Sequence, residues 1–560
     1  MKNILLLFVF STFVVSISNA QERTLEELRT FHHEVEEDPY ISVNRDLMPK
    51  SPAYHVRTSS YFTTQVNVDA NGDNIVGDAA NEPSLAVDPT NTDRIVLGWR
   101  QFDNISSNFR QAGFGYSNNG GQVFVFPGPI DPGVFRSDPV LDFDVDGNLY
   151  YNSLASGFTC DVYKIEDGSF NWQGPFPANG GDKQWMRMDR TNGVGARNNY
   201  SNWNSSFTTC SNQGYFTRST DGSETFESCI EIDEDPRWGT LAVDANGDLY
   251  ITGTSNNGTG IVLIKSSNAK DAGSTIVWDF STFVDLDGDL AVGQPINPQG
   301  LTGQTWVDVD LNNDNVYVLA SVDRSSNGDP ADVMFAKSTD GGQSFAAPIR
   351  INTDSGTSAY QWFGTMSVAP NGRIDVIWLD TRDAPSGTRD SVLYYSFSED
   401  EGETWSVNEP LSDPFNPNIG YPMQNKMGDY FDMKSDNDYA HVAWANTLNG
   451  GQDVYYTRIT PIALGLEDFA THAFGAKVSP NPVRENTSIQ FTIQEDATTQ
   501  VVIYDLQGKK VNTLLDETVS GNQQLNWDGT NEAGVRLNDG LYFVSITSGR
   551  EKATMKVVLQ

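Results

Sequence analysis

The stretch Ser338-Thr-Asp-Gly-Gly-Gln-Ser-Phe345 is one of four copies of an eight-residue box. Each copy begins with Ser, has Asp or Asn two residues later and Gly near its middle, and ends with an aromatic residue. A box that recurs at long intervals indicates a repeated architecture. The other copies are Ser117-Asn-Asn-Gly-Gly-Gln-Val-Phe124, Ser219-Thr-Asp-Gly-Ser-Glu-Thr-Phe226 and Ser398-Glu-Asp-Glu-Gly-Glu-Thr-Trp405.

A longer repeat surrounds the boxes. In seven places an alternating apolar segment runs into an Asp or a turn and is followed by a second such segment, as in residues 84–88 and 95–99. These units recur with a mean period of about 58 residues, and no helical periodicity lies between them. Strand pairs at even spacing with Gly, Asn and Asp turns predict an all-β fold of the propeller type.

We expect seven blades over residues 58–465, with six blades as the alternative. The seventh unit ends one strand short, after residues 453–459. The alternating residues 58–68 can supply the missing strand from the other end of the domain. That pairing would close the ring and remove the exposed sheet edges.

The boxes closely resemble the Asp-box (BNR repeat) of sialidase-like β-propellers, whose true sialidases have six blades. The resemblance implies that the box residues support turns and lie away from the chemistry. The residues that would carry this structural role are Ser117, Asn119, Ser219, Asp221, Phe226, Ser338, Asp340, Phe345, Ser398, Asp400 and Trp405.

The N-terminus predicts export. Residues 1–20 combine a basic start, an apolar run over residues 4–17 and the small-residue cleavage site Ser18-Asn-Ala20, which is the pattern of a secretory signal peptide. The run is too short to span a bilayer, and no later segment reaches 18 apolar residues, so no transmembrane segment is expected. Residues 21–57 then form an N-terminal extension, and the protein is expected to be secreted or attached to the outer cell surface.

The C-terminal residues 477–560 predict a second, small domain. Period-two alternation between Gly, Asn and Asp turns favours a β-sandwich. Four ordered motifs resemble the C-terminal sorting domain of the type IX secretion system: Pro480-Asn-Pro482, Tyr504-Asp-Leu-Gln-Gly-Lys509, Trp527-Asp-Gly529 and Asp539-Gly-Leu-Tyr-Phe543. The resemblance implies a Bacteroidetes-type bacterium and the type IX machinery as a partner. A carbohydrate-binding sandwich is the alternative.

The charge of the chain excludes some partners. With 36 basic and 74 acidic residues, its net charge is −38. Such a charge disfavours nucleic acid and anionic membranes as general partners. It also makes any local group of arginines informative.

The three cysteines predict one disulfide. Cys210 and Cys229 flank the second box almost symmetrically, and a bridge between them is worth about 3 kcal/mol in the chain-entropy model. Cys160 is left over. No Cys-x-x-Cys pair or His cluster indicates zinc.

Ligands of propellers usually bind at one mouth of the central channel, so the loops at that mouth carry the candidate site. Arginine is the bidentate partner of carboxylate and sulfate groups, and Trp238 and Trp362 lie beside these loops. We therefore expect an acidic or sulfated glycan as ligand; the alternative is that each arginine pairs with a neighbouring Asp at the rim. The arginines are Arg100, Arg237, Arg324 and Arg382.

The resemblance to sialidases implies an arginine triad, a Tyr nucleophile with a Glu, and an Asp acid. Tyr430 is placed like the nucleophile, and Asp380 and Glu82 can act as acid and base. Asn81 stands where the first triad arginine is expected, which is a departure from the family. Whether the protein is a glycoside hydrolase, a non-catalytic binding or scaffold propeller, or a polysaccharide lyase therefore stays open.

A metal site also stays open, and no cofactor is required. Asp142-Phe-Asp-Val-Asp-Gly147 begins like an EF-hand loop, but Ser153 takes the place of its final Glu. Residues 69–73 and 244–248 look similar, and tight-turn chemistry explains all three. Calcium remains possible because residues 285–289 form another acidic loop.

Overall fold

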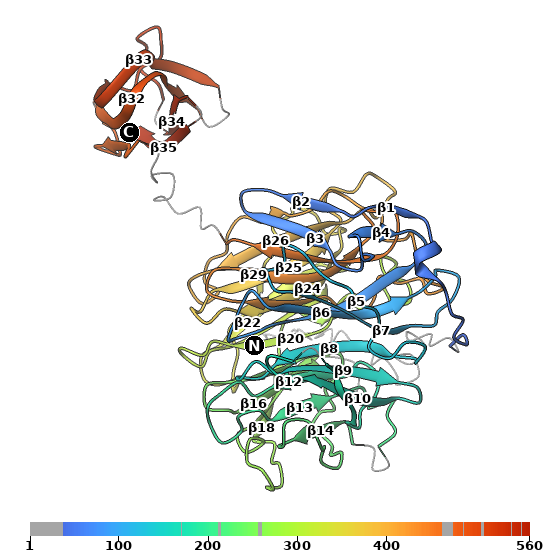
Figure 1. The fold of residues 1–560 in the computed structure, drawn as a ribbon. Coiled ribbons are helices and arrows are strands. Elements are labelled where there is room, and N and C mark those ends of the chain that lie inside the picture. Colours follow the sequence, from blue (N-terminus) through green and yellow to red (C-terminus); the bar gives the residue numbers. More distant parts are fainter. Residues whose placement is uncertain are drawn as a thin grey trace, which may run out of the picture. The chain divides into compact units, whose positions relative to one another are not determined.

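The computed structural model describes residues 37–559 apart from 170, 206, 211–213, 256–259, 462–473, 485, 506–508, 539 and 550. The chain divides into two compact units, residues 1–461 and 462–560 (Figure 1). The expected signal peptide, residues 1–20, lies outside the described residues, as do residues 21–36. None of the described helices has the length and apolar character needed to cross a membrane.

The described fold is all-β apart from one short 3-10 helix, η1 (Arg45–Leu47). Residues expected as an extension belong to the first unit: β1 (Lys50–Pro52) pairs with β4 (Asp73–Ile75), and β2 (His55–Arg57) pairs with β3 (Tyr61–Gln65). The first unit then continues as seven antiparallel sheets in chain order.

The sheets have three to five strands each. In order they are β5 (Ala79–Val87), β6 (Ile95–Phe102), β7 (Gln111–Ser117); β8 (Ser137–Phe143), β9 (Leu149–Ala155), β10 (Thr159–Ile165), β11 (Gln173–Pro177); β12 (Trp185–Met188), β13 (Asn199–Asn202), β14 (Phe216–Ser219); β15 (Leu241–Val243), β16 (Leu249–Thr254), β17 (Ile261–Ser266), β18 (Phe280–Val284); β19 (Gly288–Leu290), β20 (Trp306–Val309), β21 (Val316–Arg324), β22 (Asp332–Ser338), β23 (Ile349–Arg350); β24 (Gln361–Val368), β25 (Ile374–Asp380), β26 (Val392–Ser398), β27 (Glu409–Pro410); and β28 (Asp432–Ser435), β29 (Ala440–Asn446), β30 (Asp453–Ile459).

The innermost strands form a closed ring. The strands β5, β8, β12, β15, β20, β24 and β28 each contact the next, and β28 contacts β5 again. Figure 1 shows the yellow and orange last strands of the unit beside the blue first ones, with the cyan and green sheets below them. A ring of antiparallel sheets around a central axis is the arrangement of a β-propeller.

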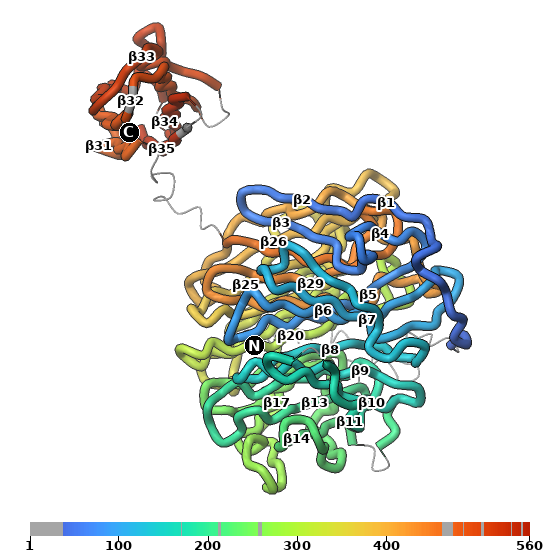
Figure 2. Tube along the Cα trace, in the orientation of Figure 1, coloured from blue at the N-terminus to red at the C-terminus, as the bar shows by residue number. Residues whose placement is uncertain are grey.

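The last sheet contains strands from both ends of the unit. The strand β3 pairs antiparallel with β30, with Tyr61 opposite Ile459. Figure 2 shows the blue N-terminal strands beside the orange C-terminal ones. The prediction that residues 58–68 fill the open slot of the seventh unit is therefore confirmed.

Side chains link the inner strands to one another. A buried N–H needs a hydrogen-bond partner, and the backbone of one strand finds it on a side chain of a neighbouring strand. Six such bonds run around the ring: from Leu141 N to Ser84 (3.0 Å), Met188 N to Asp142 (3.0 Å), Val307 N to Thr240 (3.0 Å), Val368 N to Asp308 (2.8 Å), Ser435 N to Ser367 (3.0 Å) and Leu85 N to Asp432 (3.0 Å).

Aromatic rings fill the middle of the channel. Trp185, Trp306 and Tyr430 come from the third and fifth sheets and the start of the seventh, and all three are buried. The ring of Trp185 lies 5.3 Å from that of Trp306 and 5.2 Å from that of Tyr430, in edge-to-face contacts. Edge-to-face contact is a favoured geometry of aromatic pairs. These rings therefore separate the two mouths of the channel from one another.

The four boxes form turns after the third strand of their sheets. In the third copy, the hydroxyl of Ser338 donates to Asp340 (2.8 Å) and accepts the N–H of Gly342 (2.8 Å), and Asp340 accepts the N–H of Ser344 (2.9 Å). The other copies repeat these bonds, and Phe124, Phe226, Phe345 and Trp405 pack against the apolar core. A related turn that the sequence analysis missed follows β17, where Ser266 accepts the N–H of Ala269 (3.1 Å).

Cys210 and Cys229 flank the second of these turns and form a disulfide with their Cα atoms 6.2 Å apart. This is the pairing that the sequence predicts. Cys160 is a buried free thiol.

The second unit has its own core. Its strands are β31 (Lys477–Ser479), β32 (Thr487–Tyr504), β33 (Lys510–Trp527), β34 (Gly540–Ser548) and β35 (Glu551–Leu559), in one antiparallel sheet. Two of them are 18 residues long. Their alternating residues bury Ile489, Phe491, Trp527 and Val544.

Candidate functional site

The chain leads into each inner strand through a backbone bend. In five sheets the residue at the bend has a left-handed backbone although it is not Gly, at a cost of order 1 kcal/mol each. Three of the residues at these bends are charged. The residues are Glu82, Asp138, Lys183, Trp238 and Phe363, with Gly303 and Gly428 in the other two sheets.

Three of these bends build a buried charged cluster. The carboxylate of Glu82 lies 3.2 Å from Arg100 and 3.2 Å from Lys426. Lys183 lies 2.6 Å from Asp429 and 3.5 Å from Asp138. All six residues are buried, and Lys183 also lies 3.6 Å from the buried Asp182, so the acids and bases of the cluster pair with one another.

The carboxyl groups of this cluster differ in pKa. Burial raises the pKa of Glu82 to about 8, against the opposing effect of Arg100 and Lys426. Burial also raises the pKa of Asp138, but Lys183 and Arg100 outweigh it, so that the pKa is lowered overall. The pKa values of two acids in one cluster are thus shifted in opposite directions by their surroundings.

Tyr430 lies in the same cluster, near Glu82 and Arg100. Its hydroxyl donates a hydrogen bond to the carbonyl of Pro139 (2.9 Å), and burial raises its pKa well above the usual value. Of the three candidate catalytic residues, the structure therefore brings Glu82 and Tyr430 together, with the phenol already engaged.

Two loops cover this mouth. The side chain of Asn297 donates to the carbonyl of Gly428 (2.8 Å) and accepts the N–H of Met427 (2.9 Å). The N–H of Leu301 donates to Asp429 (2.8 Å), which also binds Lys183 and Lys426. The loop before β20 is thus tied to the loop before β28 above the charged cluster.

Asp380 lies in a second cluster, beside the fifth and sixth sheets. It accepts hydrogen bonds from Trp378 (2.8 Å), Arg382 (2.9 Å) and Gln361 (3.1 Å). Among the described residues, no hydrogen bond or ion pair joins it to Glu82, so the expected acid and base are not paired.

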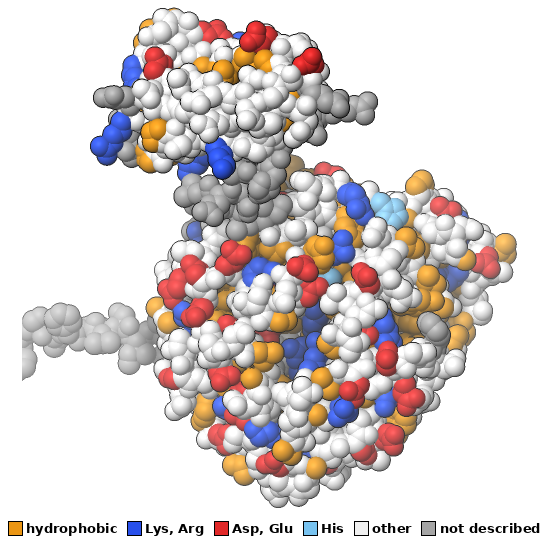
Figure 3. All heavy atoms as spheres, turned by 60° about the vertical axis from the view of Figure 1, so that its left-hand side comes forward, with side chains coloured by type: hydrophobic (Ala, Val, Ile, Leu, Met, Phe, Trp, Pro, Cys, Tyr) orange, Lys and Arg blue, Asp and Glu red, His pale blue; other side chains and the backbone are white. Residues whose placement is uncertain are grey.

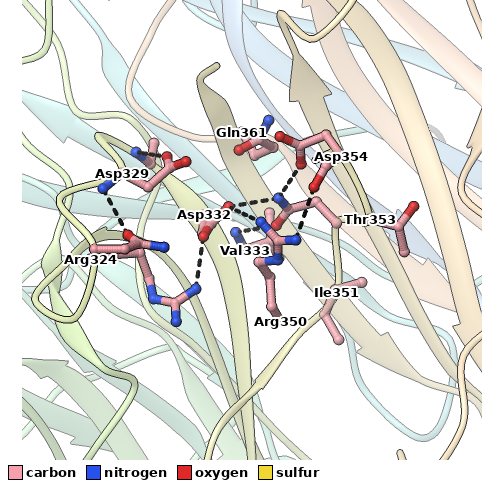
Figure 4. Close-up of polar contacts among 12 residues, drawn as sticks. Arg324, Asp329, Asp332, Val333, Arg350, Ile351, Thr353, Asp354 and Gln361 are labelled. Carbon is pink, nitrogen blue, oxygen red and sulfur yellow. Dashed lines mark hydrogen bonds and ion pairs between the residues drawn. The ribbon is translucent and has the colours of Figure 1, made fainter. Parts of the chain in front are cut away.

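Figure 4 shows the part of this second cluster around Arg324 and Asp332. Arg324 binds Asp332 (2.7 Å) and Asp287 (2.8 Å), and Asp332 in turn lies near Arg350 (3.6 Å). Burial, followed by the charge of Asp332, raises the pKa of Asp329 to about 6. The arginines here serve to neutralise carboxylates.

The expected ligand-binding group is corrected in two respects. Arg100, Arg237, Arg324 and Arg382 do not face one open mouth: each pairs with an acid, and Arg237 does so with Asp235 (3.1 Å). Trp238 and Trp362 are buried, so neither presents a ring face on which a sugar can stack. Sequence spacing placed these residues near the mouth but could not show what covers them.

The acidic turns are explained by their backbone. Asp144 accepts the N–H groups of Asp146 (3.0 Å) and Asn148 (2.9 Å), and Asp244 repeats these bonds with Asn246 and Asp248. Within the described residues, no group of three or more His, Cys, Asp and Glu is arranged to hold a metal ion.

Comparisons with known proteins give one family match. The FlgD Ig-like domain matches residues 477–552. No curated protein matches the chain significantly. The first unit lies outside the matched segment.

Solved structures resemble the chain weakly. A protein of unknown function from Dyadobacter fermentans is 14% identical with a TM-score of 0.41, covering 72% of this chain and 99% of that one. PorZ, a surface component of the type-IX secretion system of Porphyromonas gingivalis, is 13% identical with a TM-score of 0.28, covering 90% and 69%. A Trypanosoma rangeli sialidase is 11% identical with a TM-score of 0.34, covering 90% and 89%. Similarity at this level says nothing about function. The assignment of the fold is based on the sheet topology described above.

Proposed function

We propose that the seven sheets are the blades of a seven-bladed propeller that acts by binding a partner rather than by catalysis. One observation carries this proposal: the three residues expected to be catalytic are buried and already engaged. Glu82 lies between Arg100 and Lys426, the hydroxyl of Tyr430 donates to a backbone carbonyl, and Asp380 accepts hydrogen bonds from three residues.

A second candidate function is glycoside hydrolysis. Glu82, Arg100 and Tyr430 converge, and a carboxyl pKa raised to about 8 is the kind of shift found at functional sites. Catalysis at this place requires that the loop around Asn297 leave the mouth, because it covers the charged cluster. A polysaccharide lyase would face the same obstacle.

The experiment is product analysis by mass spectrometry. The mature chain is incubated with sialylated, uronic and sulfated glycans, with calcium and with a chelator, and Glu82→Gln and Asp380→Asn are run beside it. We expect no product from any sample. Free sialic acid or shortened chains that vanish in Glu82→Gln would establish a hydrolase, and unsaturated ends would establish a lyase.

We further propose that the second unit is a small β-sandwich that acts as a sorting domain for type IX secretion. Its four ordered motifs support this proposal, as does its separation into a compact unit with its own core. The protein would then be secreted or attached to the outer cell surface.

A reporter tests the export proposal. Residues 477–560 are fused to a periplasmic reporter in a bacterium with a type IX system and in a mutant lacking that system. We expect the reporter at the cell surface or in the medium only in the first strain. Retention in the periplasm of both strains would refute the proposal.

A further inference from the structure

The other mouth of the channel carries a group of basic side chains. It lies at the end of the inner strands where the tight turns begin, beyond the aromatic rings of Trp185, Trp306 and Tyr430. Figure 3 shows basic side chains gathered in a hollow near the centre of one face of the first unit. Arg187, Arg190 and Lys434 lie around the buried Asp142 at this mouth, and we call these three residues the basic hollow.

Equivalent positions of the inner strands supply its floor. The residue two places before the turn is Asp142 in the second sheet, Arg187 in the third, Asp308 in the fifth and Lys434 in the seventh. In the remaining sheets this position holds the small residues Ala86, Ala242 and Ser367. Small side chains on three sides leave space beside the guanidinium of Arg187.

Two of the acids at this mouth are buried, and the third, Asp308, is 15% exposed. The side chains of Asp142 and Asp432 are 1% and 0% exposed, whereas those of Arg187, Arg190 and Lys434 are 20%, 30% and 13% exposed. Burial raises the pKa of Asp142, but Arg190, Arg187 and Lys434 outweigh it, so that the pKa is lowered and the group stays ionised. The accessible surface of the hollow is therefore positive in a chain whose net charge is −38.

Arg187 differs from its two basic neighbours. Arg190 donates to the carbonyl of Phe143 (2.9 Å), and Lys434 donates to Asp432 (3.1 Å). The nearest acids to Arg187 are Asp308 at 3.7 Å and Asp142 at 4.0 Å, which is beyond hydrogen-bond distance. Among the described residues, no hydrogen bond of its guanidinium is present.

We propose that the basic hollow binds the carboxylate of an acidic sugar, with Arg187 as the bidentate donor and Arg190 and Lys434 beside it. A planar carboxylate matches the fork of a guanidinium. The aromatic rings close the channel beneath, so that the ligand enters as one acidic group at the end of a glycan. The proposal rests on the binding function above and places it at the mouth opposite to the one that the sequence suggested.

Calorimetry with the mature full-length chain tests the proposal. The probes are glucuronate and N-acetylneuraminate, with inorganic sulfate to measure the contribution of charge alone and glucose as the neutral control. Arg187→Gln should weaken binding of both acidic sugars at least tenfold, and binding should weaken as salt is added. Arg197→Gln is the matched control, because Arg197 lies in the turn between β12 and β13, is half exposed and pairs with Asp146. It should leave the affinity unchanged.

A second variant guards against loss of folding. Lys434→Gln keeps Arg187 in place and should weaken binding several-fold, with circular dichroism reporting the fold of each variant. The proposal is overturned if no acidic sugar binds at millimolar concentration, if glucose binds equally well, or if Arg187→Gln binds as the unaltered chain does. Products in the mass-spectrometric experiment would instead refute the non-catalytic function and leave this site standing.

Discussion

Asp432, on the inner strand of the last sheet, accepts the backbone N–H of Leu85, on the inner strand of the first sheet, at 3.0 Å. The same carboxylate accepts the hydroxyl of Ser84 (2.7 Å) and lies 3.1 Å from Lys434. The ring is therefore closed by a specific charge-assisted contact as well as by strand pairing and packing.

Asp432→Ala should destabilise the first unit by about 3 kcal/mol, because it leaves a buried N–H, a hydroxyl and a lysine without their partner. Asp438→Ala is the control, since Asp438 is exposed on the turn that follows the same strand. That change should stay within about 0.5 kcal/mol. Thermal unfolding followed by calorimetry measures both, and equal midpoints would contradict the role of Asp432.

The raised pKa of Glu82 predicts that the stability of the folded chain depends on pH. This pKa is about 8 in the folded chain and has an ordinary value of 4.5. Between these values the folded state holds a proton that the unfolded state has lost, so stability falls as pH rises. The contribution is complete below about pH 4.5 and lost above about pH 8.

Glu82→Gln should flatten this dependence. The amide imitates the protonated carboxyl, so the variant should match the unaltered chain near pH 5 and exceed its melting temperature near pH 8. Melting temperatures at half-unit pH steps give the comparison. Parallel curves for the two proteins would show that Glu82 does not titrate in this window.

The disulfide should be visible in thiol labelling. Under native conditions no cysteine should react with a maleimide, because Cys210 and Cys229 are bonded and Cys160 is buried. In denaturant, one thiol should react without reductant and three with it. The double change Cys210→Ala, Cys229→Ala should cost about 3 kcal/mol. Three reactive thiols in denaturant without reductant would disprove the bond.

The first box provides a natural control for the third. Asn119 accepts the hydroxyl of Ser117 (2.8 Å) and the N–H of Val123 (3.1 Å), as Asp340 does with Ser338 and Ser344. Asp340→Asn should therefore change stability by less than about 0.5 kcal/mol, and Asp340→Ala should cost about 1–2 kcal/mol. The free energy of unfolding of the two variants tests this expectation. A larger loss of stability with Asp340→Asn would mean that the negative charge of Asp340, and not its role as a hydrogen-bond acceptor, stabilises the turn.

Local chemistry explains what the sequence could predict. The box turns depend on hydrogen bonds between residues two to four apart, such as Ser338 with Asp340 and Gly342, so their spacing is visible in the chain. The closing strand was predictable because the alternation of residues 58–68 had no partner elsewhere. The disulfide followed from the two cysteines flanking one box.

The candidate site was less predictable because its contacts join distant parts of the chain. Arg100 meets Glu82 only across a bend whose left-handed residue is not Gly, and Lys426 arrives from the last sheet. No local sequence pattern indicates that Trp238 and Trp362 are buried. Arg187 could have been found by aligning the seven units, because Asp142, Asp308 and Lys434 occupy the same position and charged residues are rare inside strands.

The pairing of β3 with β30 governs the order in which this domain can be completed. In a chain made from its N-terminus, residues 61–65 are present long before residues 453–459, and until these are made β3 lacks its neighbour β30 in the seventh sheet. The backbone N–H of Leu85 likewise has to stay without its acceptor until Asp432 has been made. The chain therefore remains an open, protease-sensitive arc for most of its synthesis and becomes a closed ring only when the segment just before the second unit has been made.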